Sequence, residues 1–269
     1  MSLLEHVRGS GFAHPSEIVH LFVGGSQLHG AKVAQTDDLD IYGVFVEPPE
    51  QSLGFRQLNH FVWSTAGDDR RNGPDDVDVT LYSLRKWAAL AAKGNATTLH
   101  FFFAPPDPEI TSHIWNEVVA HRAMFLSKRS GAQFRGFAES QMRRLKGEGV
   151  GKHGIREEYV GKFGYDTKAA MHLLRLLFEG IELLTTGWIT LPRPEKEFLI
   201  SIRTGEFGSL EKVLNFANQK FLELDDAERK SPLPDSVEME KVSALVTRLY
   251  LEHWGRAGSL RAPAVGVVP

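Results

Sequence analysis

Residues 17–46, EIVHLFVGGSQLHGAKVAQTDDLDIYGVFV, decide the fold. Their apolar run at 18–23 has the length of a β-strand and is stopped by Gly24-Gly25. Ser26 then stands where a short helix begins, so its hydroxyl and the neighbouring N–H groups can face an anion. The stretch predicts a strand, a tight glycine turn, a short helix, a loop and a second strand.

The second of these strands carries a pair of acids. Asp38-Leu39-Asp40-Ile41 alternates polar and apolar residues, which places the carboxylates of Asp38 and Asp40 on one face, whereas Asp37 points to the other face. Neighbouring carboxylates repel each other unless a cation lies between them, and their hard oxygen atoms favour Mg²⁺ or Mn²⁺. A phosphate-binding turn followed by a metal-binding pair is the minimum needed to handle a nucleoside triphosphate.

The composition is that of an ordinary globular chain. Of the 269 residues, 42% are hydrophobic and 24% are charged, so extended disorder is not expected. The net charge of −3 argues against a broad non-specific nucleic-acid surface but allows a local basic cleft. Without cysteine there is no disulfide or thiolate zinc site. We find no signal peptide and no apolar run of about 18 residues, and we therefore expect a cytoplasmic protein with no membrane partner.

The elements after residue 46 change character along the chain. Residues 50–76 are rich in Gly, Asn, Pro and charge, which predicts an exposed loop, and 77–82 alternate like a third strand. Ser83 is placed as the N-cap of a helix over 84–93, and Asn95 as a C-terminal cap. The remaining pattern predicts helices at about 109–122, 130–147, 163–187, 194–203, 208–228 and 235–254.

The switch from strands to helices near residue 105 predicts an α+β fold with two parts. We expect residues 1–106 to form a catalytic domain with a small mixed sheet. Residues 107–257 then form a C-terminal helical domain that completes the active-site cleft, and 258–269 form a flexible tail.

A third carboxylate is expected on the third strand. Asp76 and Asp78 share its polar face, so their spacing does not choose between them. Asp78 lies deeper in the apolar alternation and is the preferred candidate. The alternative is that both acids only solvate the outer face of a half-buried strand.

The helix expected over 163–187 is apolar almost all round, yet it carries a polar stripe. Lys168, His172 and Arg175 stand at i, i+4 and i+7, which stacks three basic side chains on one face. Burying such a stripe is costly without an anionic partner. A triphosphate or an RNA phosphate is one such partner, and Glu179 or another acid in a helix interface is the other.

Several separated motifs resemble one known superfamily. The pattern Gly25-Ser26, Gly30 and Asp38-x-Asp40 resembles the signature of the DNA polymerase beta-like nucleotidyltransferases. Three further stretches, VDVTLYSLRKW at 77–87, KGNATTLHFFFAP at 93–105 and GYDTKAAMHLLRLL at 164–177, resemble the bacterial and phage members, including the RNA-ligase-associated group. The likeness extends over about residues 17–205.

This resemblance implies a fold, a site and a reaction. It implies the polymerase beta-like fold, with two divalent metal ions bound by Asp38, Asp40 and Asp78, the last being favoured by its distance ahead of SLRKW. Gly25 and Ser26 would then hold the triphosphate, with help from Lys168, His172 and Arg175. His100 departs from the family pattern, which commonly has an acid at that position, and receives no role.

The expected function is therefore that of a metal-dependent nucleotidyltransferase, an enzyme that binds ATP or another nucleoside triphosphate and transfers its nucleotidyl group, with RNA as the favoured acceptor. One alternative is a catalytically silent nucleotide- or RNA-binding protein. Another is a toxin- or antitoxin-type enzyme that modifies a protein.

Overall fold

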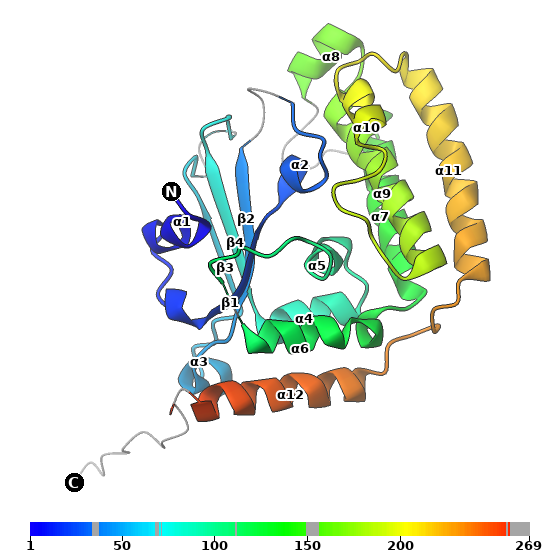
Figure 1. The fold of residues 1–269 in the computed structure, drawn as a ribbon. Coiled ribbons are helices and arrows are strands. Elements are labelled where there is room, and N and C mark those ends of the chain that lie inside the picture. The colour runs from blue at the N-terminus through cyan, green and yellow to red at the C-terminus, as the bar shows by residue number, and fades with distance from the viewer. Residues whose placement is uncertain are drawn as a thin grey trace.

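A four-stranded mixed sheet lies beside a group of long helices in this α+β protein, as predicted (Figure 1). The computed structural model describes residues 1–33, 38–67, 70, 72–110, 112–148, 156–256 and 258. The strands are β1 (Ile18–Val23), β2 (Leu39–Phe45), β3 (His60–Ser64) and β4 (Val77–Ser83).

The sheet has the order β1-β2-β4-β3. β2 pairs antiparallel with β1 and parallel with β4, and β3 pairs antiparallel with β4 at the edge. The parallel pairing sets Asp40 opposite Asp78. Two acids that are distant in the sequence are therefore brought side by side by backbone hydrogen bonding.

The two faces of the sheet are buried against different helices. Ile41 and Val79 point to one face, where they meet Val7 of helix α1 (Leu3–Gly9). Because side chains alternate along a strand, the residues between them point to the opposite face, toward the large helical core that contains Val44. The carboxylates of Asp38, Asp40 and Asp78 therefore lie on the side of the long helices.

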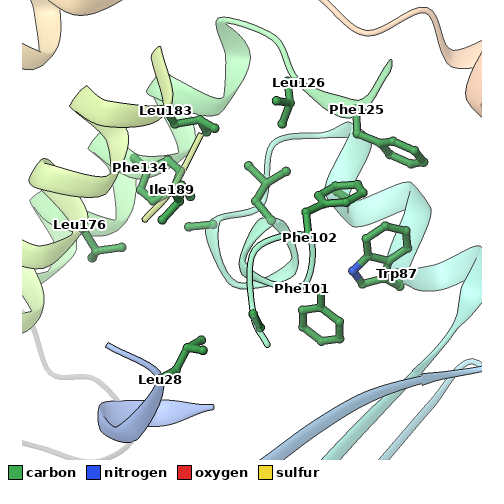
Figure 2. Packing of buried hydrophobic residues seen from close by; sticks show 14 of the residues in the cluster. Leu28, Trp87, Phe101, Phe102, Phe125, Leu126, Phe134, Leu176, Leu183 and Ile189 are labelled. Carbon is green, nitrogen blue, oxygen red and sulfur yellow. The ribbon is translucent and has the colours of Figure 1, made fainter. Parts of the chain in front are cut away.

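An aromatic cluster joins the sheet to the helices (Figure 2). Trp87 of α4 (Leu84–Ala92) is fully buried and packs edge-on against Phe102, at a centroid distance of 5.0 Å. Phe101 and Phe102 follow α5 (Ala96–His100), and Phe125 packs on both Trp87 and Phe102. Aromatic burial on this scale fixes the position of α5 relative to the sheet.

The helices that follow enclose the second half of the core. α9 is buried along most of its length and packs against α7, α10 and α11 (Figure 1), as its nearly continuous apolar pattern predicts. The remaining elements are α2 (Gly25–Leu28), α3 (Pro49–Leu53), α6 (His113–Ala120), α7 (Arg129–Leu145), α8 (Glu157–Phe163), α9 (Thr167–Thr186), α10 (Lys196–Arg203), α11 (Leu210–Lys230), α12 (Met239–Arg256) and two short 3₁₀ turns at Pro15–Glu17 and Arg122–Phe125.

The last helix, α12, returns to the sheet side of the molecule and lies along α4 (Figure 1). Tyr250 donates its hydroxyl to the buried carboxylate of Glu47 at 2.6 Å, and Trp254 Nε1 donates to the Glu47 carbonyl at 3.0 Å. Burial raises the pKa of Glu47, which favours a protonated carboxyl group in this apolar contact. These contacts fix α12 against the segment that follows β2, and the Arg85 amide at the start of α4 also donates to the Tyr250 hydroxyl at 3.0 Å.

Some local predictions are wrong. Residues 50–76 contain helix α3 and strand β3, where an exposed loop was predicted. The five-residue β3 is an edge strand in which Val62 is exposed, so it lacks the apolar alternation of its neighbours. Asn95 caps the N-terminus of α5 by accepting from the Thr98 amide, and it is not a C-terminal cap. Helix α8 was not predicted, and the predicted flexible tail at 258–269 lies outside the described residues except for Gly258.

None of the described helices is long and apolar enough to span a membrane.

Candidate active site

A glycine turn joins β1 to the short helix α2 at the end of the sheet where Asp40 of β2 and Asp78 of β4 lie. Gly25 has φ +57°, in the left-handed region, and a Cβ atom on it would lie 1.8 Å from Asp40 Oδ2. The Gly24 amide donates to the Asp40 carbonyl at 2.8 Å. Ser26 follows in the first turn of α2, as predicted, where backbone N–H groups have no partner within the helix. Glycine at position 25 allows this turn to lie directly against the Asp40 carboxylate.

Three carboxylates meet in front of this turn. Asp38, Asp40 and Asp78 each have a carboxylate oxygen within 4.8 Å of the others, and all three are half-buried. We call these three residues the carboxylate cluster. The strand register explains the arrangement, because Asp40 pairs with Asp78 across two parallel strands and Asp38 precedes Asp40 on the same face.

Asp76 does not join the carboxylate cluster, although it precedes Asp78 by only two residues. Its carboxylate accepts from Arg70 Nη1 at 2.5 Å, from the Thr65 hydroxyl at 2.6 Å and from the Gly73 amide at 2.7 Å. These donors hold the pKa of Asp76 below its ordinary value. Asp76 therefore closes the loop ahead of β4, and of the two candidates only Asp78 lies beside Asp38 and Asp40.

The ligand chemistry of the carboxylate cluster fits a divalent cation. Asp78 Oδ1 is buried and has no hydrogen-bond partner within the described part of the chain. The Asn72 side-chain amide donates to Asp38 Oδ2 at 2.7 Å and to Asp78 Oδ2 at 2.5 Å. Hard carboxylate oxygens gathered at this distance, one of them unsatisfied, form the donor set that Mg²⁺ and Mn²⁺ prefer. The sequence did not single out Asn72, which lies in the segment predicted as a loop.

A cavity of about 290 Å³ opens in front of the turn and brings the strand edge opposite helix α9. Its lining includes seven of the eight predicted site residues, namely Gly25, Ser26, Asp38, Asp40, Lys168, His172 and Arg175. Asp78 does not line the cavity, but its carboxylate lies within 4.8 Å of those of Asp38 and Asp40, which do. Acids from the sheet and bases from α9 thus face one space.

The basic side of the cavity is less uniformly charged than the sequence stripe indicated. Burial, together with the nearby Arg175 and Lys168 cations, lowers the pKa of His172 well below its ordinary value. His172 is therefore a neutral imidazole at neutral pH. Lys168 and Arg175 supply the positive charge of the stripe, and His172 can donate or accept a hydrogen bond between them.

Arg156 adds a further cation that the sequence did not single out. It lines the cavity, and its Nη1 lies 3.3 Å from Asp166 Oδ2, as does Arg144 Nε. Asp166 is also the N-cap of α9, accepting from the Ala169 amide at 3.0 Å. One buried carboxylate thus fixes the start of α9 and holds Arg156 at the cavity. Arg156 ends the glycine-punctuated segment KGEGVGKHGIR at 146–156, for which the sequence favours a flexible phosphate-contacting loop and a solvated charged surface equally. Residues 149–155 of this segment lie outside the described residues.

His29, His100 and Glu179 form a second cluster at the cavity, behind Arg175. His29 and His100 line the cavity, and each has a ring nitrogen within 3.1 Å of a Glu179 carboxylate oxygen. Arg175 Nη1 lies 3.0 Å from the same carboxylate. Of the two partners considered for the stripe, Glu179 is confirmed for Arg175. A phosphate partner stays a prediction, and Arg175 also lines the cavity. No local pattern links His29 to His100 or Glu179, because they come from three separate elements.

Comparisons with known proteins identify chains that are similar to this one. The family model for RlaP, described as the RNA repair pathway DNA polymerase beta family, matches residues 3–241. An uncharacterised 38.9 kDa protein of Enterobacteria phage T4 is 29% identical over 104 residues, which cover 38% of this chain and 31% of the phage protein. The chain thus matches about a third of that relative's length. A nucleotidyltransferase-like protein from Exiguobacterium sibiricum aligns over 98% of this chain and 93% of its own, with 11% identity and a TM-score of 0.30.

Proposed function

The chain belongs to the RNA repair pathway DNA polymerase beta family, and we propose that it is a metal-dependent nucleotidyltransferase that moves a nucleoside monophosphate from a nucleoside triphosphate to RNA. One observation carries the proposal. Asp38 and Asp40 of the carboxylate cluster, with the glycine turn directly beside them, face the Lys168 and Arg175 cations across a single cavity. Metal-binding acids and phosphate-binding groups at opposite sides of one space are what this transfer requires.

In this proposal the chain's own residues bind and orient the triphosphate. The first amides of α2 and the Ser26 hydroxyl donate to phosphate oxygens, as at other helix N-termini. Lys168 and Arg175 bind the β- and γ-phosphates from the other side of the cavity and offset the charge that develops on the leaving group. Asp38, Asp40 and Asp78 hold divalent cations, Mg²⁺ or Mn²⁺, which when bound supply Lewis-acid stabilisation of the reacting oxygens.

The proposed reaction is an in-line displacement at the α-phosphorus. The acceptor hydroxyl gives its proton to Asp78, whose Oδ1 has no hydrogen-bond partner among the described residues. The acceptor oxygen forms a bond to the α-phosphorus while the bond from that phosphorus to the bridging oxygen of the β-phosphate breaks. Pyrophosphate leaves with the electron pair of the broken bond.

RNA is proposed as the acceptor because the matching family is described by an RNA repair pathway. The most basic stretch of the chain is consistent with this choice. Residues 141–175 hold eight Lys or Arg residues against four acids, and Arg156 and Lys168 from this stretch line the cavity. A polyanionic acceptor is steered toward such a surface by long-range attraction.

The test is a labelling experiment with the purified full chain. The protein is incubated with each α-³²P-labelled NTP in Mg²⁺ or Mn²⁺, once with total cellular RNA and once with a cell protein extract. Label on RNA that depends on metal and is absent with Asp40→Asn is the expected result, and it also identifies the base.

The remaining outcomes decide between the alternatives. Label on a protein band would make the acceptor a polypeptide and overturn the RNA assignment. Binding of NTP with no label on any acceptor in either mixture would contradict the proposed transfer and favour a silent nucleotide-binding protein. Equal labelling by wild type and Asp40→Asn would contradict the role of the carboxylate cluster.

A further inference from the structure

Behind the basic side of the cavity lies a closed group of four side chains. His29 follows α2, His100 ends α5, and Arg175 and Glu179 stand one turn apart on α9. The side chain of Glu179 is completely buried, and those of His29, His100 and Arg175 are 7%, 8% and 13% exposed. We call these four residues the Glu179 cluster.

Glu179 is the centre of this cluster. Its Oε1 lies 3.0 Å from His29 Nδ1 and its Oε2 lies 3.1 Å from His100 Nε2. Arg175 Nη1 lies 3.0 Å and 3.1 Å from the same two oxygens, and 2.8 Å from His29 Nε2. Every contact needed to compensate a buried carboxylate is therefore supplied by three side chains that reach it from three elements.

The contacts also define where the protons are. A guanidinium only donates, so His29 Nε2 must accept from Arg175, and the proton of the neutral ring is then on Nδ1, beside Glu179. Burial and then Arg175 lower the pKa of His29 to about 3, which keeps that ring neutral. A carboxylate only accepts, so His100 Nε2 carries a proton as well.

The ionisation of Glu179 agrees with this assignment. Burial alone would raise its pKa, but Arg175 and the two imidazoles lower the pKa well below its ordinary value. The carboxylate is therefore charged, accepts from Arg175 and His100, and has His29 Nδ1 3.0 Å away. All hydrogen bonds of the Arg175 guanidinium within the described residues involve Nη1, which leaves Nε and Nη2 for a ligand in the cavity.

A metal ion is the alternative use of two imidazoles and a carboxylate at this spacing. The position of Arg175 argues against it. A cation between the three ligands would lie next to the guanidinium, and it would need the His29 Nδ1 lone pair that the tautomer above uses to hold a proton. Arg175 already supplies the positive charge that a metal would bring.

From this geometry we propose that Glu179 is a positioning residue for Arg175, and that His29 and His100 complete the arrangement that aims the guanidinium at the phosphates of a nucleoside triphosphate. The inference rests on the proposed function for the identity of the ligand. Glu179 itself does not contact the substrate in this arrangement. Its effect reaches the reaction through Arg175, whose orientation the buried carboxylate fixes.

The test uses inorganic tripolyphosphate with Mg²⁺, because this probe is independent of the base, and measures its Kd by calorimetry. Glu179→Gln keeps the volume of the side chain but removes the charge that holds Arg175. We expect binding to weaken about tenfold, the effect of losing one charge-assisted hydrogen bond to the ligand. Simple electrostatics predicts the opposite, since removing a negative charge beside the cavity would strengthen the binding of an anion.

Glu182→Gln is the matched control. It removes the same charge from the same helix, and its contacts are to Thr190 and Arg193, away from the cavity. We expect its Kd to equal that of wild type. A double-mutant cycle supplies the decisive comparison, because Glu179→Gln should cause no further loss in an Arg175→Ala background if it acts through Arg175. A full, additive loss in that background, or unchanged or tighter binding by Glu179→Gln alone, would overturn the proposal.

A second measurement on the wild-type chain does not depend on a variant folding. Long-range ¹H–¹⁵N NMR of the histidine rings should show the His29 proton on Nδ1, and a proton on Nε2 would contradict the proposed arrangement. If wild type binds no tripolyphosphate, the proposed function is wrong. The position of the His29 proton is measured independently of ligand binding, so it still tests whether the Glu179 cluster holds Arg175. Stoichiometric Zn²⁺ that is retained by wild type and lost in Glu179→Gln would make the cluster a metal site and overturn the inference.

Discussion

Two acidic clusters lie at one cavity and are built in opposite ways. The carboxylate cluster gathers three like charges from neighbouring strands, each half-buried at the edge of the sheet. The Glu179 cluster gathers one carboxylate, one guanidinium and two imidazoles from separate helical elements, and it is almost fully buried. The first concentrates negative charge, and the second contains its own compensating cation.

The difference shows how a protein can hold charges that are unfavourable in isolation. Backbone pairing keeps Asp40 opposite Asp78 in spite of their repulsion, so the sheet bears the cost and a cation from solution can relieve it. Glu179 is placed where water does not reach, and there the partner must be part of the chain. A cluster that is compensated from outside is suited to binding, and one that is compensated from within is suited to positioning.

The largest expected effect follows from neutralising the carboxylate cluster. Asp40→Asn removes one of the three charges that we propose hold the metal, and we expect nucleotidyl transfer to fall about 1,000-fold or more, which corresponds to roughly 4 kcal/mol of lost transition-state stabilisation. The rate of label transfer from α-³²P-NTP measures the effect. Chelation of the metal with EDTA should abolish transfer by wild type.

The matched control for this variant is Asp75→Asn. Asp75 is an exposed acid just ahead of β4 and is outside the cluster. Its replacement should leave transfer within about twofold of wild type, as is usual for a surface site. Wild-type turnover by Asp40→Asn, or an equal loss in both variants, would show that the carboxylate cluster does not hold a catalytic metal.

The corresponding change in the Glu179 cluster should act mainly on stability. Glu179→Ala leaves the Arg175 guanidinium buried without its carboxylate, and we expect the free energy of unfolding to fall by about 3–5 kcal/mol. Chemical denaturation with urea measures the change. Asp40→Asn relieves repulsion between like charges and should be as stable as wild type or more so. If Glu179→Ala were as stable as wild type, the cluster would not be a compensated ion pair.

The sequence predicted the first cluster because its geometry is local. Asp38 and Asp40 are on one strand, and a period of two is enough to place them on the same face. The third acid needed the parallel pairing of β2 and β4, which spacing does not reveal. The sequence therefore preferred Asp78 only for its deeper place in the alternation and for the family resemblance, and the fold then separated it from Asp76. The edge strand β3 was missed because Val62 on its exposed face is apolar, so polar and apolar residues do not alternate along it.

The second cluster could not be assembled from the sequence. Its members come from a turn, a short helix and a long helix, and tertiary packing alone brings them together. The stripe on α9 indicated that Arg175 needs an anionic partner, and the sequence allowed either a phosphate or Glu179 to be that partner. Periodicity shows which residues share a face, but it does not show what the face meets.

A smaller effect is expected where the glycine turn touches the carboxylate cluster. Gly25→Ala puts a Cβ atom 1.8 Å from Asp40 Oδ2 and forces a side chain into φ +57°. We expect the strained backbone to cost about 1–3 kcal/mol of stability and the displaced carboxylate to reduce transfer. Gly67→Ala is the matched control, since Gly67 has φ +64° and a Cβ atom added there would meet no atom within 4 Å. Equal transfer rates in the two variants would show that only backbone strain matters.

The most gradual effect is a dependence of stability on pH. The folded-state pKa of His29 is about 3, below its ordinary value of 6.5, so the unfolded chain binds one more proton between these values. The contribution is complete above pH 6.5 and is lost as the pH falls toward 3. His29 alone should give a slope of up to about 1.4 kcal/mol per pH unit in that window. His20, buried against Trp115 with its pKa also lowered to about 3, should add an equal slope. The free energies of unfolding of His29→Gln and His20→Gln, measured by denaturation between about pH 4 and pH 7, should each lose one such slope. A pH dependence parallel to that of wild type would show that folding does not lower the pKa of these rings.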